Sequence, residues 1–237
     1  MLSAKPWRAV AVFQFCTTQV LCLFLGLTLA GLLGKCGVTG FSQPESFGNI
    51  LLATLSFHGA AWVLIGIFLS QHETSWSAAF GLRGPKLARS LLIGVAVGVA
   101  ILPVALLLKH WSTELLELAG WPPEDEAAVR LLAGASTPWV RVYLGFFAVI
   151  LAPVAEEFIF RGMLYPLVKQ LGKPRLALIG VNLLFAAIHM NAAALVPLFV
   201  LALTFTWLYE HTDNLLAPIV AHGIFNTANL IIFLMQS

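Results

Sequence analysis

Apolar residues form long uninterrupted runs along most of this chain. A helix needs about 20 residues to cross the hydrocarbon core of a bilayer, and seven runs approach or reach that length. These runs are Val10–Leu33, Asn49–Ser70, Ala88–Leu108, Val140–Phe160, Leu176–Met190, Leu195–Tyr209 and Leu215–Met235. They contain Gly and Pro, and they lack the period-two alternation of barrel strands. The pattern therefore predicts an all-α bundle of about seven transmembrane helices, or eight.

The composition supports the same fold class. Hydrophobic residues make up 59% of the 237 residues, charged residues only 10%, and the mean hydropathy is +0.91. A soluble domain would carry about 25% charged residues. The first run is longer than the roughly 7–15 apolar residues of a secretory signal. We therefore expect residues 1–237 to form one polytopic transmembrane domain whose main partner is the lipid bilayer.

Charge is sparse and unevenly placed. The net charge of +2, with its basic residues in connectors, indicates no nucleic-acid partner. Three basic segments fall on one side if seven helices alternate across the membrane: Lys5 and Arg8, then Arg83, Lys86 and Arg89, then Lys169, Lys173 and Arg175. Basic connectors favour the cytoplasm, so we expect a cytoplasmic N-terminus. The connector Lys109–Trp139, with acidic Glu124, Asp125 and Glu126, is then expected outside.

Ionisable residues within a membrane span are costly and usually functional. Glu156, Glu157 and Arg161 follow the apolar run of the fourth predicted helix. Glu157 and Arg161 are four residues apart, the favoured spacing for an acid–base pair on a helix. Glu156 points about 100° away, so it needs water, a proton or a histidine as partner. The alternative is that these charges mark a helix end at the membrane interface.

Two further polar groups occupy single helix faces. Asn182, Phe185 and His189 are spaced i, i+3 and i+7, and His222, Asn226 and Asn229 are spaced i, i+4 and i+7. Such stripes indicate hydrogen bonding between helices or a wet cavity. Taken together with Glu156, they supply a general base and hydrogen-bond donors for an oxyanion. We therefore expect residues 140–237 to hold the catalytic helices.

These groups resemble the motifs of a known family. Glu156-Glu157-x-x-x-Arg161, Phe185-x-x-x-His189 and His222-x-x-x-Asn226 are similar to the three motifs of the CAAX-protease and bacteriocin-processing family, also called type II CAAX prenyl endopeptidases or ABI proteins. The resemblance covers the chain from Leu151 on. It implies a water-filled site in which Glu156 and His189 activate water. His222 and Asn226 would stabilise the oxyanion, while Glu157, Arg161 and Phe185 support the site.

The resemblance implies an intramembrane endopeptidase that hydrolyses a peptide bond in a membrane-associated substrate. That substrate would be a prenylated CAAX-type or a leader-type peptide, and the location would be a bacterial cell membrane. Metal-free glutamate catalysis is favoured. Glu156, His189 and His222 would be the ligands if zinc is used, although the His-Glu-x-x-His signature is absent. A non-catalytic scaffold and a proton-coupled transporter are the alternatives, but no inverted repeat supports transport.

Helix counting raises a question of depth. It places Glu156 and His222 near the cytoplasmic face, and His189 near the opposite end of its short run. For these residues to meet, the fourth helix must continue beyond Phe160 through the apolar segment Met163–Val168, or the fifth must be displaced.

Overall fold

The computed structural model describes residues 2–43, 46–82, 84, 87–121, 127–135 and 137–236. Its regular elements in these ranges are all helical, and η marks short π-helical segments. They are α1 (Ala9–Lys35), α2 (Phe47–Thr54), η1 (Leu55–Gly59), α3 (Ala60–Gln71), α4 (Trp76–Phe80), α5 (Leu87–Leu118), α6 (Ala127–Gly134), α7 (Pro138–Phe146), η2 (Phe147–Leu151), α8 (Ala152–Glu157), η3 (Phe158–Leu164), α9 (Tyr165–Gln170), α10 (Pro174–Leu176), η4 (Ala177–Val181), α11 (Asn182–Ala187), α12 (Ala192–Thr212) and α13 (Leu216–Gln236).

The chain is an integral multi-pass membrane protein, as predicted. In the described ranges, six helices are long and apolar enough to cross a bilayer: Ala9–Lys35, Phe47–Gln71, Leu87–Leu118, Pro138–Gln170, Ala192–Thr212 and Leu216–Met235. The remaining predicted span, Leu176–Met190, is a shorter helix over Pro174–Ala187. It ends early because Met190 adopts a left-handed backbone conformation, with φ 51°. Asn191 then caps α12 by accepting a hydrogen bond from the backbone N–H of Ala194 at 3.0 Å.

The fourth span continues past Phe160 to Gln170, which was one of the two ways in which the depth conflict could be resolved. Glu156 consequently lies within the helix and not at its end, about 20 Å from Gln170 at 1.5 Å per residue. His189 lies a similar distance, about 20 Å, beyond the start of α10 at Pro174. The carboxylate and the histidine therefore reach comparable depths.

The prediction that Lys109–Trp139 is a connector was wrong, because helices occupy much of this range. Helix α5 continues to Leu118, and α6 and α7 occupy Ala127–Gly134 and Pro138–Phe146. Helices can include the polar residues of Lys109–Trp139 because these residues lie at the ends of membrane spans, where water can solvate their side chains. The acidic cluster Glu124, Asp125 and Glu126 lies outside the described residues, as do Arg83 and Lys86 of one basic segment.

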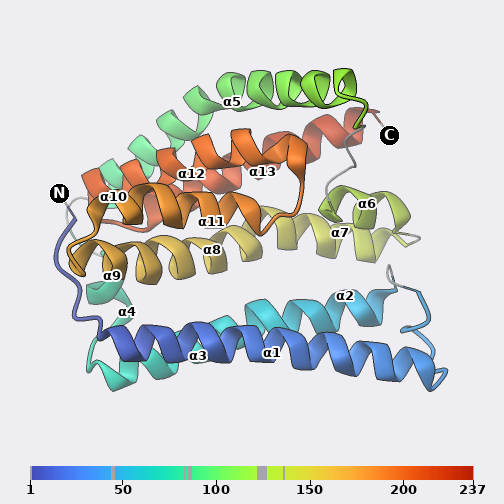
Figure 1. The fold of residues 1–237 in the computed structure, drawn as a ribbon, viewed down its shortest axis with the longest axis horizontal. Coiled ribbons are helices and arrows are strands. Elements are labelled where there is room, and N and C mark those ends of the chain that lie inside the picture. Colours follow the sequence, from blue (N-terminus) through green and yellow to red (C-terminus); the bar gives the residue numbers. More distant parts are fainter. Residues whose placement is uncertain are drawn as a thin grey trace.

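The helices form layers (Figure 1). Helix α1 and the α2–η1–α3 helix make one layer, the α7–α9 helix lies beside it, and α10–α13 with α5 lie beyond. The N-terminal segment, α4, the α9–α10 turn and the α12–α13 turn gather at one end of the bundle. Lys5 Nζ contacts Asp213 Oδ1 there at 3.0 Å, and the N–H of Leu215 donates to Phe80 O at 3.0 Å. Two of the predicted basic segments thus share one end.

The π-helical segments share one property. A widened turn leaves a carbonyl outside the regular ladder, and a bilayer offers no water to replace the lost bond. In each of the four segments one carbonyl accepts a hydrogen bond from a side-chain N–H. The pairs are Gln19 to Phe57 at 2.7 Å, Asn226 to Ala148 at 2.7 Å, Trp7 to Gly162 at 2.8 Å and Asn182 to Leu178 at 2.7 Å. Three of these bonds also join separate helices or segments.

Glycine allows α5 to approach α13 closely. A Cβ atom added at Gly94 would lie 2.5 Å from Ala217 O, and one added at Gly98 would lie 2.9 Å from Ala221 Cα. Small residues at helix contacts let backbones approach in membranes, where dispersion and hydrogen bonds drive packing. This contact holds α13, which carries the third motif, in position.

We expect Gly94→Ala to destabilise the protein, because its methyl group would collide with backbone that cannot rotate away. The expected cost is about 1–3 kcal/mol, measured as a lower thermal unfolding midpoint in detergent. Gly66→Ala is the matched control, since a Cβ atom there meets no atom within 4 Å. Equal midpoints for the two variants would contradict the close packing of α5 on α13.

Candidate active site

The centre of the site is a fully buried ion pair. Nη1 of Arg161 donates to Glu157 Oε1 at 3.0 Å, and both side chains have 0% exposure. Nη2 of Arg161 donates to the carbonyl of Ala202 at 3.0 Å and lies 3.4 Å from Asn182 Oδ1. This confirms the pairing predicted from the four-residue spacing. It also excludes the alternative that these charges mark an interfacial helix end.

Asn182 connects this ion pair to α12. Its Oδ1 also accepts a hydrogen bond from Thr206 Oγ1 at 2.9 Å, while its Nδ2 donates to Leu178 O. Sequence reasoning had placed Asn182 on one face with Phe185, and the Phe185 ring centroid does lie 4.5 Å from the guanidinium carbon of Arg161. Thr206 was missed. Its only signal was a hydroxyl in an apolar run, and such hydroxyls commonly bond to their own helix.

His222 bridges the two adjacent carboxylates. Its Nδ1 donates to Glu157 Oε1 at 3.0 Å, and its Nε2 lies 3.8 Å from Glu156 Oε2. The imidazole stacks on Phe205, with ring centroids 4.9 Å apart at 21°, and meets the edge of Phe185 at 5.9 Å. Packing and hydrogen bonding therefore fix its orientation.

The two carboxylates differ in access. The Glu157 side chain has 0% exposure, whereas that of Glu156 has 16%. Because successive residues on a helix diverge by about 100°, one carboxylate faces the packed network while the other faces an accessible space. Glu156 is therefore the carboxylate that a water molecule can reach.

His189 and Asn226 each use one polar group for a local bond. Nδ1 of His189 donates to the carbonyl of Phe185 at 2.8 Å, and Nε2 has no hydrogen-bond partner among the described residues. Nδ2 of Asn226 donates to Ala148 O at 2.7 Å, which uses one of its two N–H groups. In the described part of the chain no hydrogen bond joins His189 to Glu156 directly. Phe185 links the two histidines, with its ring centroid 5.0 Å from that of His189.

The predicted motif residues other than Asn226 are thus linked to one another by hydrogen bonds, ion pairs or ring contacts. Glu156, Glu157, Arg161 and His222 interact directly, and Phe185 packs against both histidines. Asn229, the last residue of the third polar stripe, instead bonds to Phe225 O of its own helix at 3.2 Å. Over the described ranges no three His, Cys, Asp or Glu side chains are grouped closely enough to hold a metal ion. The alternative zinc ligands Glu156, His189 and His222 are therefore not assembled as a three-ligand set in this conformation.

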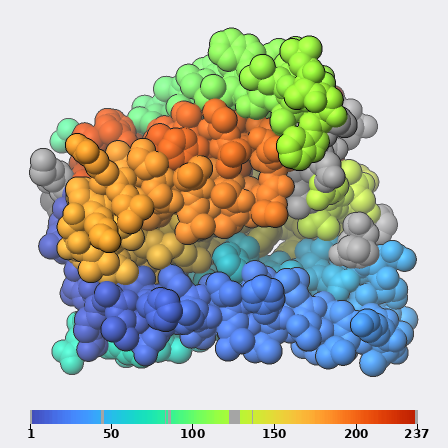
Figure 2. Space-filling model, viewed as in Figure 1, coloured from blue at the N-terminus to red at the C-terminus, as the bar shows by residue number. Residues whose placement is uncertain are grey.

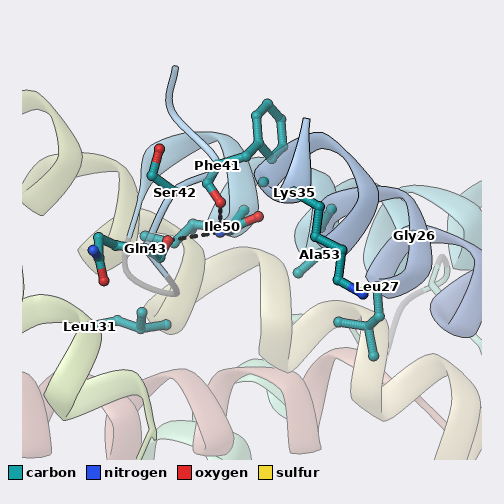
Figure 3. A pocket seen from close by; sticks show the side chains of 13 residues that line it. Gly26, Leu27, Lys35, Phe41, Ser42, Gln43, Ile50, Ala53 and Leu131 are labelled. Carbon is teal, nitrogen blue, oxygen red and sulfur yellow. Dashed lines mark hydrogen bonds between the residues drawn. The ribbon is translucent and has the colours of Figure 1, made fainter. Parts of the chain in front are cut away.

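A separate cavity of about 520 Å³ lies in the N-terminal layer (Figure 3). It is bounded by α1, the following connector, α2 and Leu131 of α6. The cavity exists partly because small residues of α1 do not fill it. A Cβ atom added at Gly31, for example, would meet no atom within 4 Å. Among the described residues of its lining, Lys35 is the one that is ionisable. None of the motif residues reaches this cavity, so it is distinct from the candidate active site.

We expect Glu157→Ala to lower stability as well as any activity. The change leaves Arg161 without its counter-charge and His222 Nδ1 without its acceptor, and breaking a buried pair in this way costs about 3–5 kcal/mol. The measurement is thermal unfolding in detergent. Replacing both Glu157 and Arg161 by Met should recover part of the loss, because no unpaired charge remains. Unchanged melting of the single variant would contradict the network.

Comparison with known families agrees with this geometry. Residues 137–228 match the family model described as type II CAAX prenyl endopeptidase Rce1-like. The matched segment begins at α7, ends within α13 and includes all three motifs. Searches of the curated proteins and of the solved structures gave no match. With its ordered motifs, the segment 137–228 of this chain is thus similar to the Rce1-like type II CAAX prenyl endopeptidases.

Proposed function

We propose that this protein is an intramembrane endopeptidase in which Glu156 activates the attacking water. The match of residues 137–228 to the Rce1-like family model supports a membrane-embedded peptidase in general. The observation that carries the mechanism is the contrast between two adjacent carboxylates. Glu157 is enclosed and paired, while Glu156 is partly accessible and lies beside His222.

Water activation requires a base and an orienting group. Glu156 accepts a proton from the water as its oxygen attacks the carbonyl carbon of the substrate peptide bond. The bond from His189 Nδ1 to Phe185 O fixes the tautomer, so Nε2 can accept the second hydrogen bond of the same water. The comparable depths of Glu156 and His189 in the bundle support this shared task.

Stabilisation of the oxyanion requires donors that are already in place. Asn226 retains one amide N–H after its bond to Ala148 O, and the Ala148 contact holds that amide in a fixed direction. His222 is the second donor when both of its ring nitrogens are protonated. Glu156, Glu157 and Arg161 together carry a net charge of −1, so one additional proton makes the buried cluster neutral, which a medium of low polarity favours.

The proton taken from the water completes the reaction. It is held on Glu156, whose Oε2 lies 3.8 Å from His222 Nε2. When the carbon–nitrogen bond breaks, this proton passes to the departing amine, so Glu156 changes from base to acid. No metal ion is needed for this sequence. The cluster lies about 20 Å inside the end of its helix, which favours a membrane-associated substrate, and the family resemblance favours a prenylated CAAX-type or leader-type peptide.

We expect Glu156→Gln to reduce cleavage by about 10²- to 10⁴-fold, the usual contribution of a general base. Purified wild type and variant would be incubated with prenylated and leader-type reporter peptides, with and without a zinc chelator. Wild-type cleavage should survive chelation, and the variant should unfold at the wild-type temperature.

Three outcomes would change the proposal. Normal cleavage by Glu156→Gln would remove Glu156 from the mechanism. Loss of wild-type cleavage on chelation, with recovery on adding zinc, would favour the zinc-dependent alternative. Retention of peptides without cleavage by the wild type would favour a non-catalytic scaffold.

A further inference from the structure

A histidine outside the three motifs is half-buried, and its two ring nitrogens are buried without hydrogen-bond partners. His58 lies in η1, near the middle of the Phe47–Gln71 span. Neither Nδ1 nor Nε2 of its ring has a partner among the described residues, and both atoms are buried. A neutral imidazole carries one donor and one acceptor, and leaving both unmet lowers stability. An ionisable residue in mid-span with unmet hydrogen bonds indicates a functional role.

The ring of His58 is held in a fixed orientation. It meets the Phe147 ring edge-on, with centroids 4.6 Å apart at 86°, and the Phe57 ring at 4.9 Å and 74°. Gln19 of α1 anchors the same turn by donating to Phe57 O at 2.7 Å, and its own Oε1 is also buried without a partner. Unmet polar atoms therefore occur on both helices of the N-terminal layer where they meet at η1.

His58 faces the helix that carries the catalytic carboxylates. Phe147 begins η2 and precedes Ala148, whose carbonyl accepts the hydrogen bond from Asn226. Glu156 follows Phe147 in the same helix, about 13 Å further along its axis. The space-filling view shows a hollow between the N-terminal layer and this helix, with atoms of the α2–η1–α3 helix visible in it (Figure 2).

We propose that His58 is a substrate-positioning residue whose ring nitrogens, closed off in this structure, hydrogen bond to the backbone of a peptide that enters between the two layers and parts them. This inference rests on the proposed endopeptidase function. A peptide backbone presents both N–H and C=O groups, which match the donor and acceptor of the imidazole. An extended chain covers about 3.3 Å per residue. The 13 Å separation therefore places the His58 contact about four residues from the scissile bond.

The test compares His58→Phe and His58→Gln with the wild type. His58→Phe should raise KM about tenfold, with kcat within about twofold, because it removes one hydrogen-bonding contact made equally in ground and transition states. His58→Gln should recover part of the loss. Peptides too short to extend about four residues from the scissile bond should be cleaved equally by all three proteins. The thermal midpoint of His58→Phe should be equal to or above that of the wild type, because an unpaired buried polar group is removed.

His110→Phe is the matched control, since His110 in α5 has a side chain that is 63% exposed. It should leave KM unchanged. A wild-type KM for His58→Phe with long peptides would overturn the proposal. The proposal would also be overturned if His58→Phe lowered the thermal midpoint and reduced cleavage of long and short peptides equally, because that result indicates a structural role. If the wild type cleaves no peptide while His58→Phe raises the midpoint, the endopeptidase proposal fails and the positioning role fails with it.

Discussion

The structure depends on burying the guanidinium of Arg161 within an apolar bundle. An unpaired charge there is prohibitively costly, and three helices supply hydrogen-bond acceptors to this guanidinium. Glu157 provides the counter-charge from the same helix, α12 provides the carbonyl of Ala202, and α11 provides Asn182. Because hydrogen bonds require specific distances and angles, this one side chain fixes the relative positions of three helices.

The network extends from Arg161 to the atoms proposed to carry out the chemistry. Glu157 Oε1 accepts from Arg161 on one side and from His222 Nδ1 on the other. The orientation of His222 relative to Glu156 therefore depends on a charge pair that is fully buried. This arrangement explains how two adjacent glutamates serve different purposes. Glu157 neutralises the charge of Arg161 and positions His222, whereas Glu156 remains accessible to water.

Backbone carbonyls within the bilayer, like the buried charges, need hydrogen-bond partners inside the protein. Each π-helical turn frees a carbonyl that must find a donor inside the protein, and side chains of Trp7, Gln19, Asn182 and Asn226 supply it. Trp7 connects the N-terminal segment to η3, directly beside Arg161, and Asn226 connects α13 to η2. The irregular turns thus act as points where separate parts of the chain are held in register. His58 also lies in such a turn, and although the carbonyl of Phe57 has its donor, the ring nitrogens of His58 have no partner within the described residues.

The sequence by itself determined whatever depends on spacing within one helix. The apolar runs predicted the membrane spans, and the four-residue separation of Glu157 and Arg161 predicted their ion pair. The ordered motifs identified Glu156, His189, His222 and Asn226 as the candidate site. Rise and rotation per residue are fixed in a helix, so such relations follow from numbering alone.

Only the tertiary structure decided the contacts between helices. The bond from His222 to Glu157, the bond from Asn226 to Ala148 and the role of Thr206 depend on which helices are adjacent and at what depth. The length of the fourth span and the early end of the fifth set those depths, and neither was fixed by the apolar pattern. The unmet hydrogen bonds of His58 were invisible for the same reason, because a missing partner is a property of the three-dimensional packing around a side chain.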